Sequence, residues 1–151
     1  KESKRVINYK KINKFIKQED KYKLKHISAF VNFSNKIKEE RKNLLNFFKK
    51  ISDNRIYGYG APAKAVTLIN FFNLNHKNIN LIIDDSKLKQ KKYIPGTKIK
   101  IYDSKILKIK PPKYIIVLAW NMYKDIINKI KKYNKIKYVI IPLPKFKIIK
   151  L

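Results

Sequence analysis

A strand, a glycine turn and a helix follow one another in residues 55–72, and this succession limits the possible folds more than any other feature of the chain. A short apolar strand precedes the turn. A helix is predicted over residues 62–72, with proline in its first turn, where no amide donor is needed. Gly58, Gly60 and Ala63 match the G-x-G-x-x-A form of the dinucleotide fingerprint. The turn therefore indicates a βαβ unit and raises the question of whether it holds a ligand.

The rest of this region repeats the alternation of apolar strands and helices. Strands are predicted at residues 81–83, 98–102, 113–120 and 137–141, a helix at 122–133 and an edge strand at 146–149. Strands that alternate with helices of about ten residues are typical of a parallel sheet. We therefore predict a small Rossmann-like α/β domain over residues 27–151, with helices on both faces of a parallel sheet.

A long helix is predicted ahead of this sheet. Apolar residues recur at spacings of three and four over residues 27–48. Ser28 is predicted to cap the start of the helix, and the turn formers at 52–54 to end it. Residues 1–26 are polar and lysine-rich with one short periodic piece. We expect them to form a linker or arm carrying one helix, leading from a preceding domain that is absent here.

The net charge of the chain is extreme, but its composition indicates that coding bias, and not a specific function, accounts for the lysines. The net charge is +28, which attracts phosphate-rich partners in general. Lysine outnumbers arginine by 35 to 3, isoleucine outnumbers leucine by 26 to 11, and asparagine occurs 15 times. These residues share AT-rich codons, and the lysines are spread along the chain. Arginine is the usual choice for bidentate phosphate and base contacts. We therefore expect a solvated lysine coat and no specific nucleic-acid partner.

The sequence offers little for metal binding or acid–base chemistry. The absence of cysteine excludes disulfides and thiolate zinc sites, and His26 and His76 have no second ligand at a suitable spacing. No serine lies in a nucleophile elbow. We predict neither a metal site nor a catalytic residue. The lysine-rich first residues lack the apolar stretch and cleavage site of a signal peptide, and no apolar run is long enough to span a bilayer, so we expect a cytoplasmic location and no membrane partner.

Candidate binding residues follow the predicted strands, at the sheet edge where ligands of doubly wound folds bind. The glycine turn lets a ligand approach the backbone, and the helix that follows offers free amides and a lysine to an anion. The candidates from this stretch are Gly58, Tyr59, Gly60, Ala61 and Lys64.

Two more stretches are predicted to reach the same edge. Asp84 follows the next strand, at the distance where an acid bonds a ribose hydroxyl, although such an acid also caps turns. Trp120 and Asn121 follow the strand at 113–120. Trp120 is suited to stacking on a base or sugar, and Asn121 is expected to cap the following helix, which leaves ligand contact open.

Several motifs in register resemble the C-terminal domain of the sugar C-methyltransferase family. They are GYGAPAK at 58–64, Asp84, YIPGT at 93–97, LAWN at 118–121 and IPLP at 141–144. The resemblance covers roughly residues 15–144. Lys91 and Ala119 depart from the glycine and proline usual in the family, which affects fine ligand geometry rather than membership.

This resemblance implies a three-part enzyme that acts on a nucleotide-linked keto-sugar. An N-terminal domain binds zinc, a middle domain binds S-adenosylmethionine and carries the catalytic base, and a Rossmann-like C-terminal domain completes the cleft. The present chain then corresponds to the C-terminal part alone. We expect it to be catalytically incomplete, to bind no cofactor itself, and to have the nucleotide-sugar and the enzyme's other two domains as partners.

Two roles within the family and two outside it stay open. The glycine turn either receives the diphosphate or nucleotide end of the substrate, or it serves only strand–helix packing. Outside the family, the alternatives are a free-standing nucleotide- or NAD-binding module and, less favoured, a basic nucleic-acid-binding protein.

Overall fold

The computed structural model describes residues 7–52 and 55–151, and the chain divides into two compact units, residues 1–39 and 40–151. The second unit contains a six-stranded sheet in the order β3-β2-β1-β4-β5-β6. The strands are β1 Ile56–Tyr59, β2 Leu81–Ile83, β3 Ile101–Tyr102, β4 Tyr114–Val117, β5 Tyr138–Ile141 and β6 Lys147–Lys150. The first five run parallel, and β6 pairs antiparallel with β5. The predicted Rossmann-like α/β class is confirmed.

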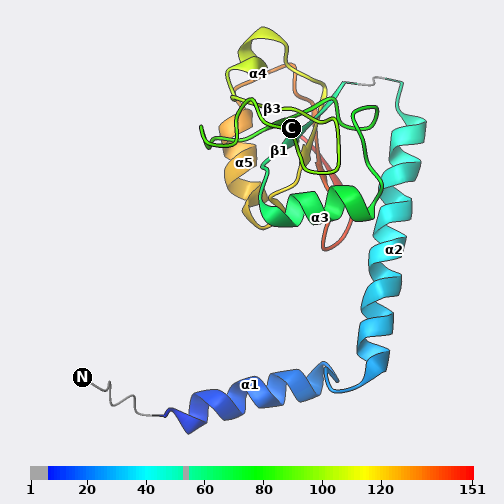
Figure 1. Ribbon diagram of the computed structural model, residues 1–151, viewed down its shortest axis with the longest axis vertical. Coiled ribbons are helices and arrows are strands. Elements are labelled where there is room, and N and C mark those ends of the chain that lie inside the picture. The colour runs from blue at the N-terminus through cyan, green and yellow to red at the C-terminus, as the bar shows by residue number, and fades with distance from the viewer. Residues whose placement is uncertain (1–6, 53–54) are drawn as a thin grey trace. The chain divides into compact units, whose positions relative to one another are not determined.

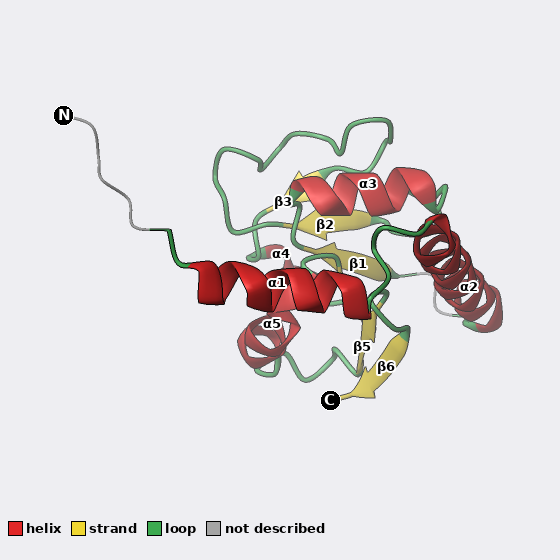
Figure 2. Ribbon diagram, turned by 90° about the horizontal axis from the view of Figure 1, so that it is seen from below, coloured by secondary structure: helices red, strands yellow, loops and turns green. Residues whose placement is uncertain are grey.

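Helices cover both faces of this sheet. They are α3 Ala63–Phe71, α4 Ile106–Ile109, the 3₁₀ turn η1 Trp120–Met122 and α5 Tyr123–Ile130. Figure 1 follows them along the chain from α3 to α5, and Figure 2 shows α3 on one side of the strands and α5 on the other. The alternation of side chains along β1 explains this layering. Tyr57 and Tyr59 pack in the core cluster that contains α5, while Gly58 faces the opposite side.

The strands are short and deeply buried, as expected for a sheet covered on both faces. All four residues of β1 and of β4 are buried. Gly58 of β1 lies opposite Ile82 of β2 and Ile116 of β4. The sheet therefore places the carboxyl ends of β1, β2 and β4 side by side.

The last part of helix α2, Ile27–Lys50, belongs to the same unit as the sheet. Leu44 is fully buried, and the ring of Phe47 meets Tyr114 edge-on at 5.6 Å between centroids. The Nε of Arg41 donates to the carbonyl of Phe72 at 3.1 Å, and the buried Glu40 carboxylate accepts from the amide of Phe146 at 2.9 Å. These contacts fix residues 40–50 against the sheet domain.

The first unit contains α1, Tyr9–Lys21, and the start of α2. Asn8 caps α1 by accepting from the amide of Lys11 at 3.0 Å, and no residue of α1 is buried. The predicted helix in the N-terminal arm is therefore present. The predicted cap at Ser28 is wrong, because α2 already begins at Ile27. The predicted turn at 52–54 falls partly on residues 53 and 54, which lie outside the described part of the chain.

Other boundaries were also predicted too generously. The strand expected at 113–120 ends at Val117, because the chain turns toward η1 through Leu118 and Ala119. The strand expected at 98–102 contains only Ile101–Tyr102. Helix α4, with the buried Leu107, was not predicted, because four residues are too few to show a periodic pattern.

Candidate functional site

The candidate site lies where the strand order reverses. From β1 the chain proceeds outward through β2 and β3 on one side, and β4 and β5 lie on the other. The carboxyl ends of β1 and β4 therefore form the switch point at which open α/β sheets bind ligands. The amides of Leu118 and Ala119 both point at the carbonyl of Tyr59, at 2.9 and 3.4 Å, which holds the two strand ends together.

The two glycines of the turn are required for separate reasons. A Cβ on Gly58 would lie 2.6 Å from Ile82 and 2.8 Å from Leu118, so this glycine allows close packing inside the core. Gly60 has φ near +90°, and a Cβ there would lie 2.7 Å from the Cβ of Ala119. Its amide donates to the carbonyl of Ile83 at 2.7 Å. The glycine pattern is therefore explained by packing and turn geometry without a ligand.

Asp84 closes the β2 side of the turn. The residue is 8% exposed, and its carboxylate accepts from the amide of Ala61 at 2.6 Å and from that of Ser86 at 2.9 Å. The ammonium of Lys89 lies 3.4 Å from the oxygen that Ala61 uses. The side-chain amide of Gln90 donates to the Asp84 carbonyl at 3.0 Å. Asp84 thus has the turn-capping contacts that the sequence allowed as the alternative to ribose binding, and it occupies one amide that a phosphate would need.

Three of the predicted residues meet on the β4 side. The ammonium of Lys64 donates to the side-chain oxygen of Asn121 and lies 4.6 Å from the centroid of the Trp120 ring. Asn121 is exposed, and Lys64 and Trp120 are partly exposed. The expected capping role of Asn121 is wrong, because it lies inside η1 and neither η1 nor α5 has a side-chain cap. We call these three residues the strand-end cluster.

The start of α3 adds donors beside this cluster. Pro62 has no amide hydrogen to donate and lies at the cap position before the helix, one residue ahead of the first-turn position predicted for it. Among the described residues, the backbone amides of Ala63 and Lys64 have no hydrogen-bond partner. The start of α3 therefore provides two free amides on the same helix turn as the Lys64 ammonium, which contacts Trp120 and Asn121, a combination suited to an anion.

Tyr59 belongs to a different hydrogen-bonded network from the strand-end cluster. Its hydroxyl donates to Asp85 at 3.0 Å, and the ammonium of Lys129 lies 2.7 Å from the other Asp85 oxygen. The hydrogen bond from Lys129 lowers the pKa of Asp85 despite partial burial. Burial, together with the negative charge of Asp85, raises the pKa of Tyr59. Nothing in the sequence distinguishes Lys129 from the many other lysines predicted on helix surfaces.

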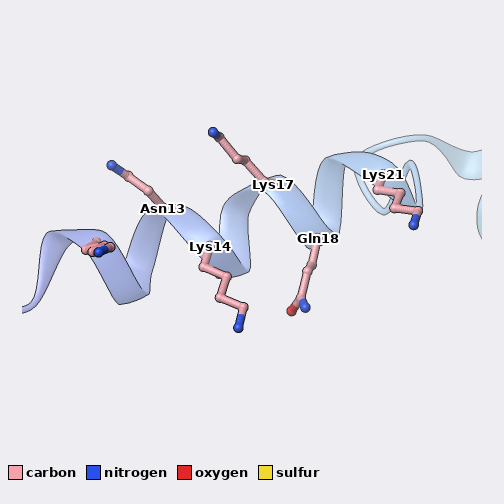
Figure 3. A pocket seen from close by; sticks show the side chains of 6 residues that line it. Asn13, Lys14, Lys17, Gln18 and Lys21 are labelled. Carbon is pink, nitrogen blue, oxygen red and sulfur yellow. The ribbon is translucent and has the colours of Figure 1, made fainter.

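The hollow beside α1 is not a second candidate. Figure 3 shows the hollow beside α1, whose six lining side chains all come from that one helix, with Asn13 and Lys17 on one side of it and Lys14 and Gln18 on the other. Within residues 7–52 and 55–151, no three His, Cys, Asp or Glu side chains gather as a metal site would require. None of the described helices combines the length and apolar character needed to cross a bilayer.

Comparisons with known proteins agree with the motif pattern. Residues 1–144 match the model of the family described as the C-methyltransferase C-terminal domain. The chain is 33% identical over 96 residues to the C-methyltransferase NovU of Streptomyces niveus. The matched region covers 62% of this chain and 23% of NovU. The chain thus spans about a quarter of the length of this relative.

A solved structure was also matched, at low similarity. It is the crystal structure of UDP-D-quinovosamine 4-dehydrogenase from Vibrio fischeri. The match has a TM-score of 0.44 and 18% identity, and it covers 66% of this chain and 96% of that chain.

Proposed function

The chain belongs to the family of C-methyltransferase C-terminal domains, and from this we propose that it is the substrate-side domain of an S-adenosylmethionine-dependent C-methyltransferase. In this proposal the substrate is a nucleotide-linked keto-sugar. A base in another domain removes the proton beside the ketone, and the enolate attacks the activated methyl group. This domain supplies no reacting group. It binds and orients the substrate, which lowers the entropic cost of bringing the reactants together.

The strand-end cluster is the observation that carries the proposal. Lys64 and the free amides of Ala63 and Lys64 provide positive potential for a diphosphate. Trp120 provides an aromatic face, and Asn121 provides an amide that can both donate and accept. Lys64 already touches Trp120 and Asn121, so a diphosphate bound to its ammonium would lie next to both side chains.

The proposed partners include the enzyme's N-terminal and middle domains. Helix α1 buries none of its residues and exposes Ile12, Phe15 and Ile16 by 44, 55 and 42%. In NovU, 77% of the sequence (the whole less the matched 23%) lies outside the part that this chain resembles. Apolar surface of this kind is stabilised when another domain covers it. We expect α1 amides to exchange hydrogen for deuterium more slowly when those domains are present, and unchanged exchange would argue against this contact.

A role in packing alone is the second candidate, and Gly58 favours it. The close approach of Ile82 and Leu118 to Gly58 requires glycine whether or not a ligand is present. A free-standing NAD module has less support. Asp84, the acid of the fingerprint, is buried and already accepts from two backbone amides, so little of its carboxylate is accessible to a ribose.

Isothermal titration calorimetry on the 151-residue chain tests the proposal. The ligands are UDP, dTDP and GDP, with NAD and S-adenosylmethionine as comparisons. We expect weak binding of at least one nucleoside diphosphate and little binding of the other two ligands. Tight S-adenosylmethionine binding would overturn the division of roles, and binding of NAD alone would favour the dinucleotide module.

A further inference from the structure

A separate cavity of about 300 Å³ opens on the α5 side of the sheet. Its walls come from four segments: the end of β1, the loop after β2, the residues before α4 and the end of α5. The lining residues used below are Tyr59, Asp85, Ser104, Lys129, Lys132 and Tyr133. Only Tyr59 belongs to the predicted site, so the cavity is distinct from the strand-end cluster. A volume of this size lies at the lower end of the range found for small-molecule sites.

The polar side chains of the cavity are linked by hydrogen bonds. Tyr59 donates to one oxygen of Asp85, and Lys129 donates to the other. Each carboxylate oxygen can accept a further hydrogen bond. Within the described residues, the hydroxyl groups of Ser104 and Tyr133 have no hydrogen-bond partner. The cavity therefore offers fixed acceptors, ammonium donors and two unused hydroxyls within one small volume.

The apolar part consists of rings and aliphatic side chains. Tyr59 is 5% exposed, and Leu107 and Ile130 are buried beside it. Tyr133 packs against the same core cluster and is partly exposed. These groups form the apolar part of the cavity lining.

This mixture favours one class of ligand. Asp85 and Lys129 largely neutralise each other, so the cavity has only Lys132 as an uncompensated charge. An ionised phosphate only accepts hydrogen bonds, so it would offer the Asp85 oxygens no donor, and an apolar ligand would remove water from the Asp85–Lys129 pair without replacing its hydrogen bonds. A pyranose ring avoids both penalties, because its hydroxyls donate and accept while its C–H face packs on aromatic rings.

We propose that this cavity binds a pyranose ring, with Asp85 accepting from its hydroxyls and Lys129, Lys132 and Ser104 donating to them. The choice of sugar class rests on the proposed function, since that function supplies a sugar-bearing substrate. The location of the proposed site does not rest on that function, because neither Lys64 nor Trp120 of the strand-end cluster lines the cavity. Of the strand-end cluster, Trp120 packs against the core cluster that contains Tyr59.

The test compares ligands with and without the sugar. UDP-glucose and UDP, and dTDP-glucose and dTDP, are titrated into the 151-residue chain by calorimetry, while methyl α-D-glucopyranoside is followed by saturation-transfer NMR. We expect the sugar to tighten binding of the nucleotide by about tenfold, the effect of one or two hydrogen bonds to charged groups. We also expect ring protons of the glucoside to receive saturation from the protein.

Variants assign any effect to the cavity. Asp85→Asn and Lys132→Met are expected to remove most of the tenfold difference and to leave binding of the bare diphosphate within about twofold, an expected value for groups outside its site. Asp125→Asn and Lys131→Met make the same charge changes on exposed positions outside the cavity and are expected to keep the difference. Circular dichroism checks that each variant is folded.

Two failures can be told apart. Equal binding of UDP-glucose and UDP, and of the dTDP pair, in the unmodified chain would overturn the sugar cavity while leaving the proposed function intact. A second outcome would be that no diphosphate binds, while the free glucoside receives saturation in the unmodified chain and loses it in Asp85→Asn. That outcome would contradict the strand-end proposal and support the cavity. Glucoside saturation that Asp85→Asn and Lys132→Met leave unchanged would place the sugar elsewhere and overturn the inference.

Discussion

The two sides of the β1 strand end differ in how far the protein satisfies its own polar groups. On the β2 side, Asp84 accepts from the amides of Ala61 and Ser86 and is almost fully buried. On the β4 side, Lys64 reaches Asn121 across a partly exposed surface, and free amides lie next to it. The acid of the dinucleotide fingerprint, Asp84, thus stabilises the glycine turn itself through these hydrogen bonds. The open side of the same turn is then where a ligand has groups to bind.

Removal of the Asp84 carboxylate should have the largest effect on stability. Asp84→Ala leaves two backbone amides unpaired in a buried turn, and we expect the free energy of unfolding to fall by about 4 kcal/mol. Urea denaturation of the purified chain measures it. Asp103→Ala is the matched control, because Asp103 also follows a strand and caps one exposed amide, that of Lys105. A loss below about 1 kcal/mol for Asp84→Ala, as expected for the control, would contradict the closed-side interpretation.

Gly60→Ala should be the next most harmful change. The added methyl group meets Ala119 in a backbone region that other residues rarely adopt, and we expect a loss of about 2 kcal/mol. Gly96→Ala is the comparison, since Gly96 also has positive φ but the added Cβ meets the exposed side chain of Asn70, which can move. Thermal unfolding should rank Gly60→Ala below Gly96→Ala in stability. The reverse order would show that contact with Ala119 is not the main constraint.

Lys64→Met should separate binding from stability on the open side. The ammonium group is partly exposed, so we expect unfolding to change by less than about 1 kcal/mol. Loss of a charge-assisted contact should weaken nucleoside diphosphate binding by about tenfold. Lys108→Met, on the exposed face of α4, is the charge-matched control. Equal weakening by both variants would indicate attraction by the overall charge rather than a defined site.

The smallest effect is expected from the Asp85 pair. The pKa of Asp85 is lowered in the folded state, so the pair stabilises the fold above the ordinary value of 3.8. This contribution disappears as the pH falls through the lower, folded value. Because the Asp85 side chain is 50% exposed, we expect Asp85→Asn to cost less than about 1 kcal/mol at pH 7. Urea unfolding between pH 7 and pH 3 should show that the difference in free energy of unfolding between the unmodified chain and Asp85→Asn becomes smaller as the pH falls. A difference that grows in acid would contradict the assigned pair.

Local sequence signals predicted most of the fold and only part of the site. The apolar run at Leu81–Ile83 and the proline before α3 mark their elements at the right positions. Helix α4 has too few residues for a periodic signal. Position in the sequence also placed Asp84 correctly at the strand end. Position in the sequence could not show whether the Asp84 carboxylate binds a ribose or a backbone amide. That depends on how the chain brings the amide of Ala61 next to a carboxylate 23 residues away.

The side-chain partnerships were the least predictable part. Asn121 fits a cap by its position, yet its oxygen bonds to Lys64, which is 57 residues earlier in the chain. Lys129 pairs with Asp85 across 44 residues and looks like any other helix lysine in the sequence. Such contacts depend on packing between α3, α5 and the strand ends, and residue spacing along one segment does not contain that information.

The central claim is that the β4 side of the turn binds the substrate and the β2 side does not. It is tested most directly by ¹H–¹⁵N NMR during titration of the chain with the nucleoside diphosphate that binds best. We predict progressive shifts of the Ala63 and Lys64 amides and of the Trp120 indole, with little change at Ser86 and Lys89. Shifts centred on Ser86 and Lys89, with Trp120 unmoved, would contradict the account.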